Sequence, residues 1–248
     1  MSVTIEHNVS VQNEDNFYRI LNQDGWAILA AESVRGEPVR ILEQIGRIIP
    51  QYNYEKFFEV TYQKGFDDAP YSQSMNGIGV HTEAPGCGHP PKYLALQCHR
   101  QARCGNGHTL LADAVRFYDQ DLAAELRSWA SQNDVEFVTV DKPGGVDKSI
   151  FRAPIRGGHK GDPIVRFSYN QFRYGNVNAS AEDIACADGE EVNPLGQIAE
   201  AGKKFFLENS ISVLIPDGCL LVWNNHRLFH GRGRYLDPAR HLTRYWLS

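Results

Sequence analysis

Residues 219–232 read CLLVWNNHRLFHGR and belong to the part of the chain that is densest in strand signal. Its apolar run at 219–224 is separated by a short polar segment from a second apolar run that begins at 229, which is typical of two antiparallel strands joined by a turn. Proline, aspartate and glycine at 216–218 mark another turn just before it. Further strand patterns lie on either side, at 210–215 and 241–247. The C-terminal part of the chain therefore predicts an antiparallel sheet.

The rest of the chain carries more strand patterns than helical ones. Helical spacing predicts helices at 14–21, 38–48, 115–129 and 193–209. Apolar alternation predicts strands at 26–30, 57–62, 77–83, 92–99, 109–112, 135–140 and 163–169. Because the two kinds do not alternate regularly, we expect a mainly β (α+β) fold, an antiparallel sandwich or barrel with flanking helices, and most specifically a jelly roll. No linker or repeat divides residues 1–248, so one domain is predicted.

Composition narrows the range of partners. The net charge of −5 and the pI of about 6.0 provide no positive field for nucleic acid or an acidic membrane surface, so a small-molecule partner is expected. No apolar run approaches the roughly 18 residues of a membrane span, and residues 1–12 do not resemble a secretory signal. Five cysteines in no zinc-binding pattern disfavour a disulfide scaffold. These features predict a cytoplasmic protein.

His81 and Glu83 stand two residues apart in the predicted strand at 77–83. Alternate residues of a strand project to the same face, so the two side chains can bind one cation. A chain with nine histidines contains about one such pair by chance, so a solvated strand is the alternative unless a third ligand exists. Two histidines and one carboxylate on one side of a metal are the ligand set of non-haem Fe(II) oxygenases.

His226 and His230 are the two candidates for the third ligand. His230 is favoured because it follows an apolar pair typical of a strand, and because Gly231 lets another backbone pass close to the site. His226 lies in a polar, turn-like stretch, where we expect it to face solvent or a loop carbonyl.

The chain resembles the Fe(II)- and 2-oxoglutarate-dependent dioxygenases of the taurine dioxygenase (TauD/TfdA) superfamily, most closely the clavaminate synthase-like branch, which uses His-x-Glu. The matching segments are 81–83, 90–96, 107–109, the segment of His230, and Arg244. The resemblance implies a double-stranded β-helix in which His81, Glu83 and His230 are the catalytic metal ligands. It also implies Fe(II), 2-oxoglutarate as cosubstrate and O2.

The distal carboxylate of 2-oxoglutarate needs a buried cation and a hydroxyl. Arg244 lies fourteen residues after His230 and shares a strand face with Leu242 and Trp246, so we expect its charge to be buried and paired. An internal carboxylate is the alternative partner. Arginine suits the cosubstrate because its planar fork donates two parallel hydrogen bonds to a carboxylate. In the resembled branch an arginine and a threonine at these separations bind the cosubstrate, which implies Arg244 and Thr109.

Substrate contacts are expected from the loop before His81 and from the strands that face the metal. Ser74, Asn76 and Arg166 are the candidates, with ordinary loop or strand roles as the alternative. Arg240 lies in a turn and is predicted at the surface, whereas Arg232 is expected to be solvated or to line the cosubstrate entrance. Position 248 is serine where several relatives carry a substrate-binding arginine, so no sulfonate-type contact is expected there.

The resemblance implies hydroxylation of an unactivated C–H bond in a free amino acid or small amine-bearing metabolite of specialised metabolism, with release of succinate and CO2. Desaturation, cyclisation and a carrier-tethered substrate are alternatives with the same cofactors. Halogenation is disfavoured, because Glu83 fills the position that chloride takes in related halogenases. A zinc hydrolase with the same ligands is a further alternative, but it leaves Arg244 and Thr109 without a role. A silent binding module is disfavoured by the intact ligand set.

Overall fold

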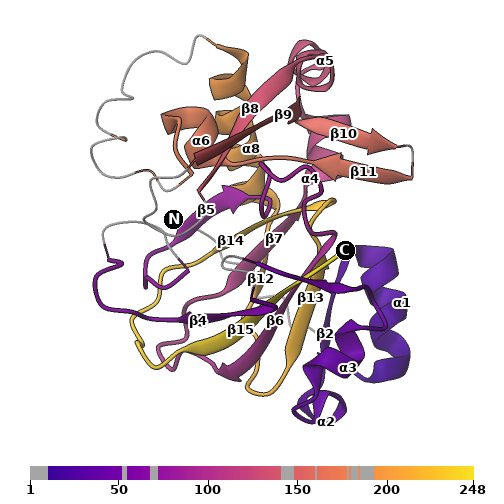
Figure 1. Cartoon of the computed structure of the whole chain (residues 1–248), viewed down its shortest axis with the longest axis vertical. Coiled ribbons are helices and arrows are strands. Elements are labelled where there is room, and N and C mark those ends of the chain that lie inside the picture. The colour runs from indigo at the N-terminus through magenta and orange to yellow at the C-terminus, as the bar shows by residue number, and fades with distance from the viewer. Residues whose placement is uncertain are drawn as a thin grey trace.

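Two sheets packed face to face form the centre of the molecule (Figure 1). The computed structural model describes residues 11–51, 55–67, 72–140, 148–159, 161–177, 179, 184 and 193–248. The larger sheet contains, in order, β1 (Val11–Gln12), β2 (Trp26–Leu29), β13 (Leu220–Asn224), β6 (Tyr93–Arg100), β15 (His241–Leu247) and β3 (Ile48–Ile49), with β4 (Phe57–Thr61) also paired to β15. The smaller sheet contains β12 (Ile211–Val213), β7 (Thr109–Asp113), β14 (Leu228–Arg232) and β5 (Ile78–His81). Apart from the parallel pair β1–β2, all these pairs are antiparallel, as the jelly-roll prediction requires.

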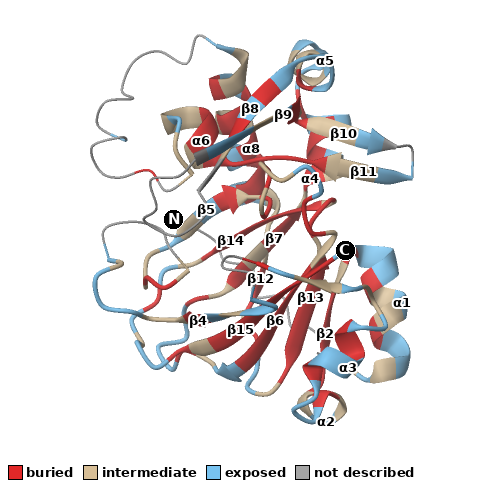
Figure 2. Cartoon of the chain, viewed as in Figure 1, coloured by how far each residue is buried: buried red, intermediate tan, exposed pale blue. Residues whose placement is uncertain are grey.

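The central strands of the larger sheet are buried on both faces, which explains their unbroken apolar sequences (Figure 2). Leu221 and Trp223 of β13 face the interior between the sheets, where they pack with Leu111 of β7. Leu220 and Val222 face the other way, against α1 (Glu14–Asp24) and α3 (Pro38–Leu42). Helix α2 (Ala31–Val34) lies between these two helices in the chain.

The outer face of the smaller sheet is covered by a second apolar cluster. Helix α8 (Pro194–Asn209) supplies Phe205 and Phe206, which pack with Phe229 of β14 and Phe117. Additional elements surround this cluster: α4 (Ala114–Arg116), the π-helical segment η2 (Phe117–Asp121), α5 (Ala124–Gln132), β8 (Asp134–Val140) paired with β9 (Lys148–Pro154), β10 (Arg156–His159) paired with β11 (Asp162–Val165), and α6 (Tyr169–Tyr174). The smaller sheet is therefore held between two apolar layers.

Three predictions of secondary structure were wrong in part. The helix expected at 115–129 is divided into α4, η2 and α5, because the chain is extended at Leu122 after a π-type hydrogen bond from Leu122 N–H to the Phe117 carbonyl. The helix expected at 38–48 ends at Leu42, and the strand expected at 163–169 gives way to α6 at Tyr169.

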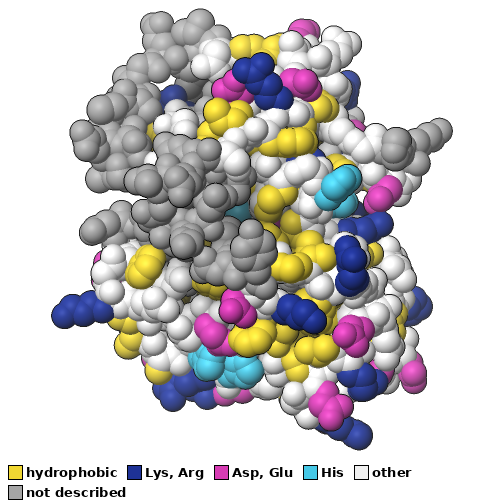
Figure 3. Space-filling model, viewed as in Figure 1, with side chains coloured by type: hydrophobic (Ala, Val, Ile, Leu, Met, Phe, Trp, Pro, Cys, Tyr) yellow, Lys and Arg dark blue, Asp and Glu magenta, His cyan; other side chains and the backbone are white. Residues whose placement is uncertain are grey.

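Charged side chains of both signs are spread over the molecular face in Figure 3, without a continuous basic area among the described residues there. This agrees with the net charge of −5. Across the described part of the chain, no helix has both the length and the apolar character needed to cross a membrane.

Candidate metal and cosubstrate site

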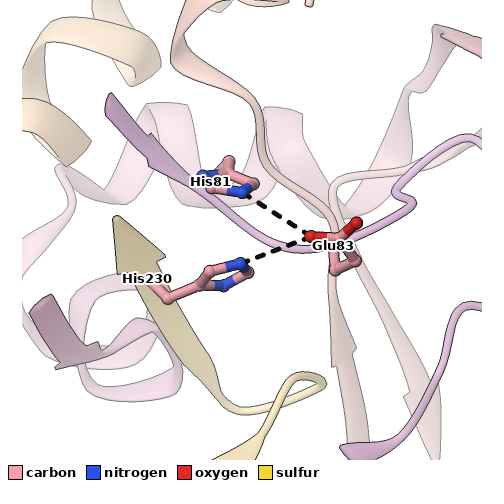
Figure 4. A group of neighbouring side chains, drawn as sticks. All are labelled: His81, Glu83 and His230. Atoms are coloured by element: carbon pink, nitrogen blue, oxygen red, sulfur yellow. Dashed lines mark ion pairs between the residues drawn. The ribbon is translucent and has the colours of Figure 1, made fainter. Parts of the chain in front are cut away.

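Two histidines and a glutamate converge on one point at the β5–β14 end of the smaller sheet (Figure 4). His81 of β5 and His230 of β14 are direct partners in the antiparallel ladder, and their ring centroids lie 4.0 Å apart. Glu83 follows β5, and its Oε2 lies 3.8 Å from His81 Nε2 and 3.6 Å from His230 Nε2. One potential ligand atom from each residue lies within 4.8 Å of the others. The predicted trio is therefore brought together.

The protonation states of the trio fit a divalent metal. His81 Nδ1 lies 2.9 Å from the Gly79 carbonyl, and donation of its proton to that oxygen leaves the Nε2 lone pair directed at Glu83. Burial, together with the neighbouring His81, lowers the pKa of His230 to about 4 and keeps its imidazole neutral at pH 7. Two imidazole nitrogens and one carboxylate are a ligand set that suits Fe(II).

Glu83 is buried and ionised. Burial by itself would raise the pKa of Glu83, but the Arg244 charge and the two neighbouring histidines hold that pKa well below its usual range. Arg244 Nη1 lies 3.0 Å from Glu83 Oε1, so the second carboxylate oxygen is paired while Oε2 faces the histidines.

Asn225 holds the backbone of Glu83, a role that the sequence reasoning missed. Its Oδ1 accepts the Glu83 N–H at 2.7 Å, and its Nδ2 donates to the carbonyls of Glu83 at 3.2 Å and Pro91 at 2.9 Å. The side chain is 1% exposed. The only hint in the sequence is that two asparagines interrupt the apolar pattern before His230, which is equally typical of a turn.

The predicted burial of Arg244 is confirmed, and its partner in this structure is the internal carboxylate of Glu83. Its Nε donates to Gln51 Oε1 at 2.9 Å, and its guanidinium lies over the rings of Phe58 and Trp246. Thr109 is also buried, directly opposite Arg232 in the β7–β14 ladder.

Several other arginines lie in places that the sequence did not predict. Arg240, expected at the surface, is 4% exposed, stacked on Tyr235 and hydrogen-bonded to the Gly107 carbonyl. Arg232, expected to be solvated or at an entrance, is buried with its guanidinium bonded to backbone carbonyls of the loop before β5. Both side chains therefore point into the protein interior, which the polar sequence around them does not indicate.

The three substrate candidates differ in what they offer. Arg166 is buried and donates to carbonyls of the loop after Glu83, so its fork is occupied. Ser74 is fully buried, whereas Asn76 is half-buried and donates to the Asp67 carbonyl. His226 does not belong to the converging trio. Its Nε2 lies 3.0 Å from the Pro90 carbonyl, in line with the predicted loop contact.

Two histidines and one carboxylate on an antiparallel jelly roll are the ligand arrangement typical of non-haem Fe(II) oxygenases. The family model described as taurine catabolism dioxygenase TauD, TfdA family, matches residues 3–246, and the chain belongs to this family of 2-oxoglutarate-dependent iron enzymes. Among curated protein sequences, none matches the chain significantly.

Solved structures with the same fold include two amino acid oxygenases. Asparagine oxygenase in complex with Fe(II), 2S,3S-3-hydroxyasparagine and succinate superposes with a TM-score of 0.71 at 16% identity, over 94% of this chain and 77% of that chain. The non-haem iron oxygenase OrfP with Fe and alpha-ketoglutaric acid gives 0.68 at 14% identity, over 95% and 78%. OrfP with Fe, succinate and (3S)-hydroxy-L-Arg gives 0.65 at 14% identity, over 95% and 79%.

Proposed function

We propose that His81, Glu83 and His230 hold Fe(II). Arg244 and Thr109 bind the distal carboxylate of 2-oxoglutarate. The enzyme hydroxylates a C–H bond of a free amino acid or small amine-bearing metabolite. The observation that carries the proposal is the convergence of three ligand atoms within 4.8 Å, with Arg244 beside Glu83. We also propose that residues 1–248 act as one catalytic domain, in the cytoplasm, and that the product belongs to specialised metabolism.

The protein's contribution is positioning within a dry, charged interior. Bound Fe(II) and 2-oxoglutarate would supply the oxidising chemistry, in which O2 converts the cosubstrate to succinate and CO2. His81 presents its Nε2, His230 presents a neutral imidazole nitrogen, and Glu83 presents a charged oxygen. Trp223, whose ring centroid lies 5.1 Å from that of His230, and the rings around Arg244 exclude water and so strengthen each charge interaction.

An amino acid substrate is supported by the two structural neighbours, which were solved with hydroxyasparagine and hydroxyarginine. At 14–16% identity the neighbours support the class of substrate and not its side chain. A panel of free amino acids and amines, screened for stimulated 2-oxoglutarate turnover, would identify the substrate. Stimulation by carrier-tethered substrates alone would contradict the proposal of a free metabolite.

The metal assignment is tested by Glu83→Ala, with Glu59→Ala as a matched control. Glu59 also lies against a histidine, with its Oε2 2.5 Å from His241 Nε2, but it stands on the exposed side of β4. We expect Glu83→Ala to lose iron-dependent succinate formation and the visible absorption band that anaerobic Fe(II) and 2-oxoglutarate produce together, whereas Glu59→Ala keeps both. Succinate formation by Glu83→Ala would contradict the ligand assignment.

A further inference from the structure

The metal motif at 81–83 is flanked by two loops, and a buried arginine binds the backbone of each. Arg166 contacts the loop at 84–88, directly after Glu83. Arg232 contacts the loop at 72–76, before β5. The partners are 78–81 and 156–160 residues away in the sequence, so these are tertiary contacts and not local turn bonds.

Arg166 forms a fork of three hydrogen bonds to main-chain oxygens. Nη1 donates to the carbonyls of Pro85 at 2.5 Å and Cys87 at 2.7 Å, and Nη2 donates to Gly88 at 3.0 Å. The ring of Phe151 lies 4.9 Å from the guanidinium carbon. Burial lowers the pKa of Arg166, and convergent carbonyl dipoles offset the cost of burying its charge.

The loop that Arg166 holds begins with a strained residue. Ala84 has a φ of +49°, a left-handed conformation that is unfavourable for a residue with a Cβ. Such a residue persists only where its surroundings fix it, and Ala84 directly follows Glu83. Its carbonyl accepts the Cys87 N–H at 3.0 Å, which closes the turn whose next carbonyls are bound by Arg166.

Arg232 has an equivalent arrangement on the other loop. Its guanidinium donates to the carbonyls of Ser72 at 3.0 Å, Ser74 at 2.7 Å and Asn76 at 2.6 Å. The two intervening carbonyls are also bound, Gln73 by the Gln63 N–H and Met75 by the Tyr235 N–H. Each of the five successive carbonyls of 72–76 therefore accepts a hydrogen bond, and these bonds fix the backbone of the loop. Burial lowers the pKa of Arg232 to about 10.

We infer that Arg166 and Arg232 are positioning residues of the active site: Arg166 sets the turn that orients Glu83, and Arg232 sets the loop wall that precedes His81. The inference rests on the proposed role of Glu83 as a metal ligand. It assigns Arg166 to the protein's own backbone and not to substrate. Lysine keeps the charge at either position but lacks the planar fork that reaches three carbonyls, so an Arg→Lys exchange isolates geometry from charge.

The test compares Arg166→Lys with Arg232→Lys, each serving as the control for the other. Co(II) titration reports the metal site through affinity and visible spectrum, and hydrogen exchange reports the two loops. We expect Arg166→Lys to weaken Co(II) binding about tenfold or more, to change its spectrum, and to lose amide protection at 84–88 only. Arg232→Lys should lose protection at 72–76 only and should weaken Co(II) binding less than Arg166→Lys does, because its loop leads into β5 and His81 and does not contain Glu83.

Two outcomes would overturn the inference: both variants bind Co(II) and exchange as the wild type does, or both lose protection at both loops equally. Phe151→Leu is a milder variant, since it removes the ring beside Arg166 and leaves the three hydrogen bonds. If Arg166→Lys fails to fold, a weakened Co(II) affinity in Phe151→Leu supports the inference, and an unchanged one overturns it. Failure of the wild type to bind Co(II) would instead contradict the proposed function.

Discussion

The side chain of Asn225 forms hydrogen bonds with both the N–H and the carbonyl of Glu83, as the backbone of an adjacent strand would. Because its amide both accepts the Glu83 N–H and donates to the Glu83 and Pro91 carbonyls, its removal takes away three hydrogen bonds to buried backbone groups. We predict that Asn225→Ala lowers the free energy of unfolding by about 2–3 kcal/mol, as measured by urea denaturation of the metal-free protein. Asn133→Ala is the control, since Asn133 donates only to Trp129 in an exposed turn. An equal loss in both variants would contradict the role of Asn225.

We expect His226 to contribute to the acid sensitivity of the metal-free protein. Burial, partly countered by the Pro90 carbonyl, lowers the pKa of His226, so the folded state binds its proton less readily than the unfolded state does. Below about pH 6.5 the unfolded chain takes up that proton, and the free energy of unfolding falls as the pH falls. We predict that His226→Gln, whose amide can still donate to the Pro90 carbonyl, has a smaller loss of stability between pH 7 and pH 5.

Urea denaturation at a series of pH values measures this difference. The control is His241→Gln, because His241 is half-exposed on β15 and pairs with Glu59. A wild-type pH slope in His226→Gln would show that other groups cause the acid sensitivity.

At the scale of elements, β14 can lie against β5 only because residue 231 is glycine. A Cβ there would stand 2.8 Å from the Ile78 carbonyl oxygen of β5 and 3.2 Å from the Phe206 ring of α8. The sequence-based prediction that Gly231 admits a close backbone is thereby confirmed. Gly79 of β5 offers a matched control, since a Cβ there meets nothing within 4 Å.

We predict that Gly231→Ala costs about 1–3 kcal/mol of stability and weakens Co(II) binding, because the strands carrying His230 and His81 must separate. Gly79→Ala should leave Co(II) affinity unchanged. Thermal unfolding and Co(II) titration measure the two effects, and similar behaviour of the two variants would contradict the packing argument.

The sequence predicted best the strands and helices that show a regular alternation or helical spacing of apolar residues along their whole length. Alternation predicts a strand at 241–247, and β15 spans His241–Leu247. Helical spacing predicts a helix at 193–209, and α8 spans Pro194–Asn209 with Asn193 as its N-cap. The helix expected at 115–129 was wrong because helical spacing cannot register the π-type turn that buries both Phe117 and Tyr118.

For the site, residue type and spacing predicted which side chains meet, since a metal needs that donor set. The roles of Arg166, Arg232 and Arg240 were not predicted, because backbone carbonyls are their acceptors and every residue has one. An acidic residue that pairs with an arginine can be found in the sequence as Asp or Glu. A backbone carbonyl that pairs with an arginine belongs to any residue, so the sequence does not mark it.

At the scale of the whole molecule, the buried charges of the described residues are unbalanced. Four arginines, Arg166, Arg232, Arg240 and Arg244, are buried together with a single carboxylate, Glu83. Carbonyl dipoles offset the charges of Arg166 and Arg232, whereas Arg244 uses Glu83 itself. A metal at Glu83 would add further positive charge beside Arg244, so the interior favours a dianion such as 2-oxoglutarate once the metal is present.

This imbalance predicts that 2-oxoglutarate stabilises the fold mainly in the presence of metal. A ligand that binds only the folded state at about 100 times its Kd adds about 2.7 kcal/mol, so we expect the Tm with Co(II) and saturating 2-oxoglutarate to exceed that with either alone. Arg244→Gln should keep the Tm increase caused by Co(II) and lose the further increase caused by 2-oxoglutarate. Arg240→Gln removes an equally buried charge that lies against Tyr235, away from Glu83, and should keep both increases relative to its own metal-free Tm. If Arg240→Gln also loses the 2-oxoglutarate increase, the cosubstrate responds to the overall positive interior and the specific role proposed for Arg244 is wrong.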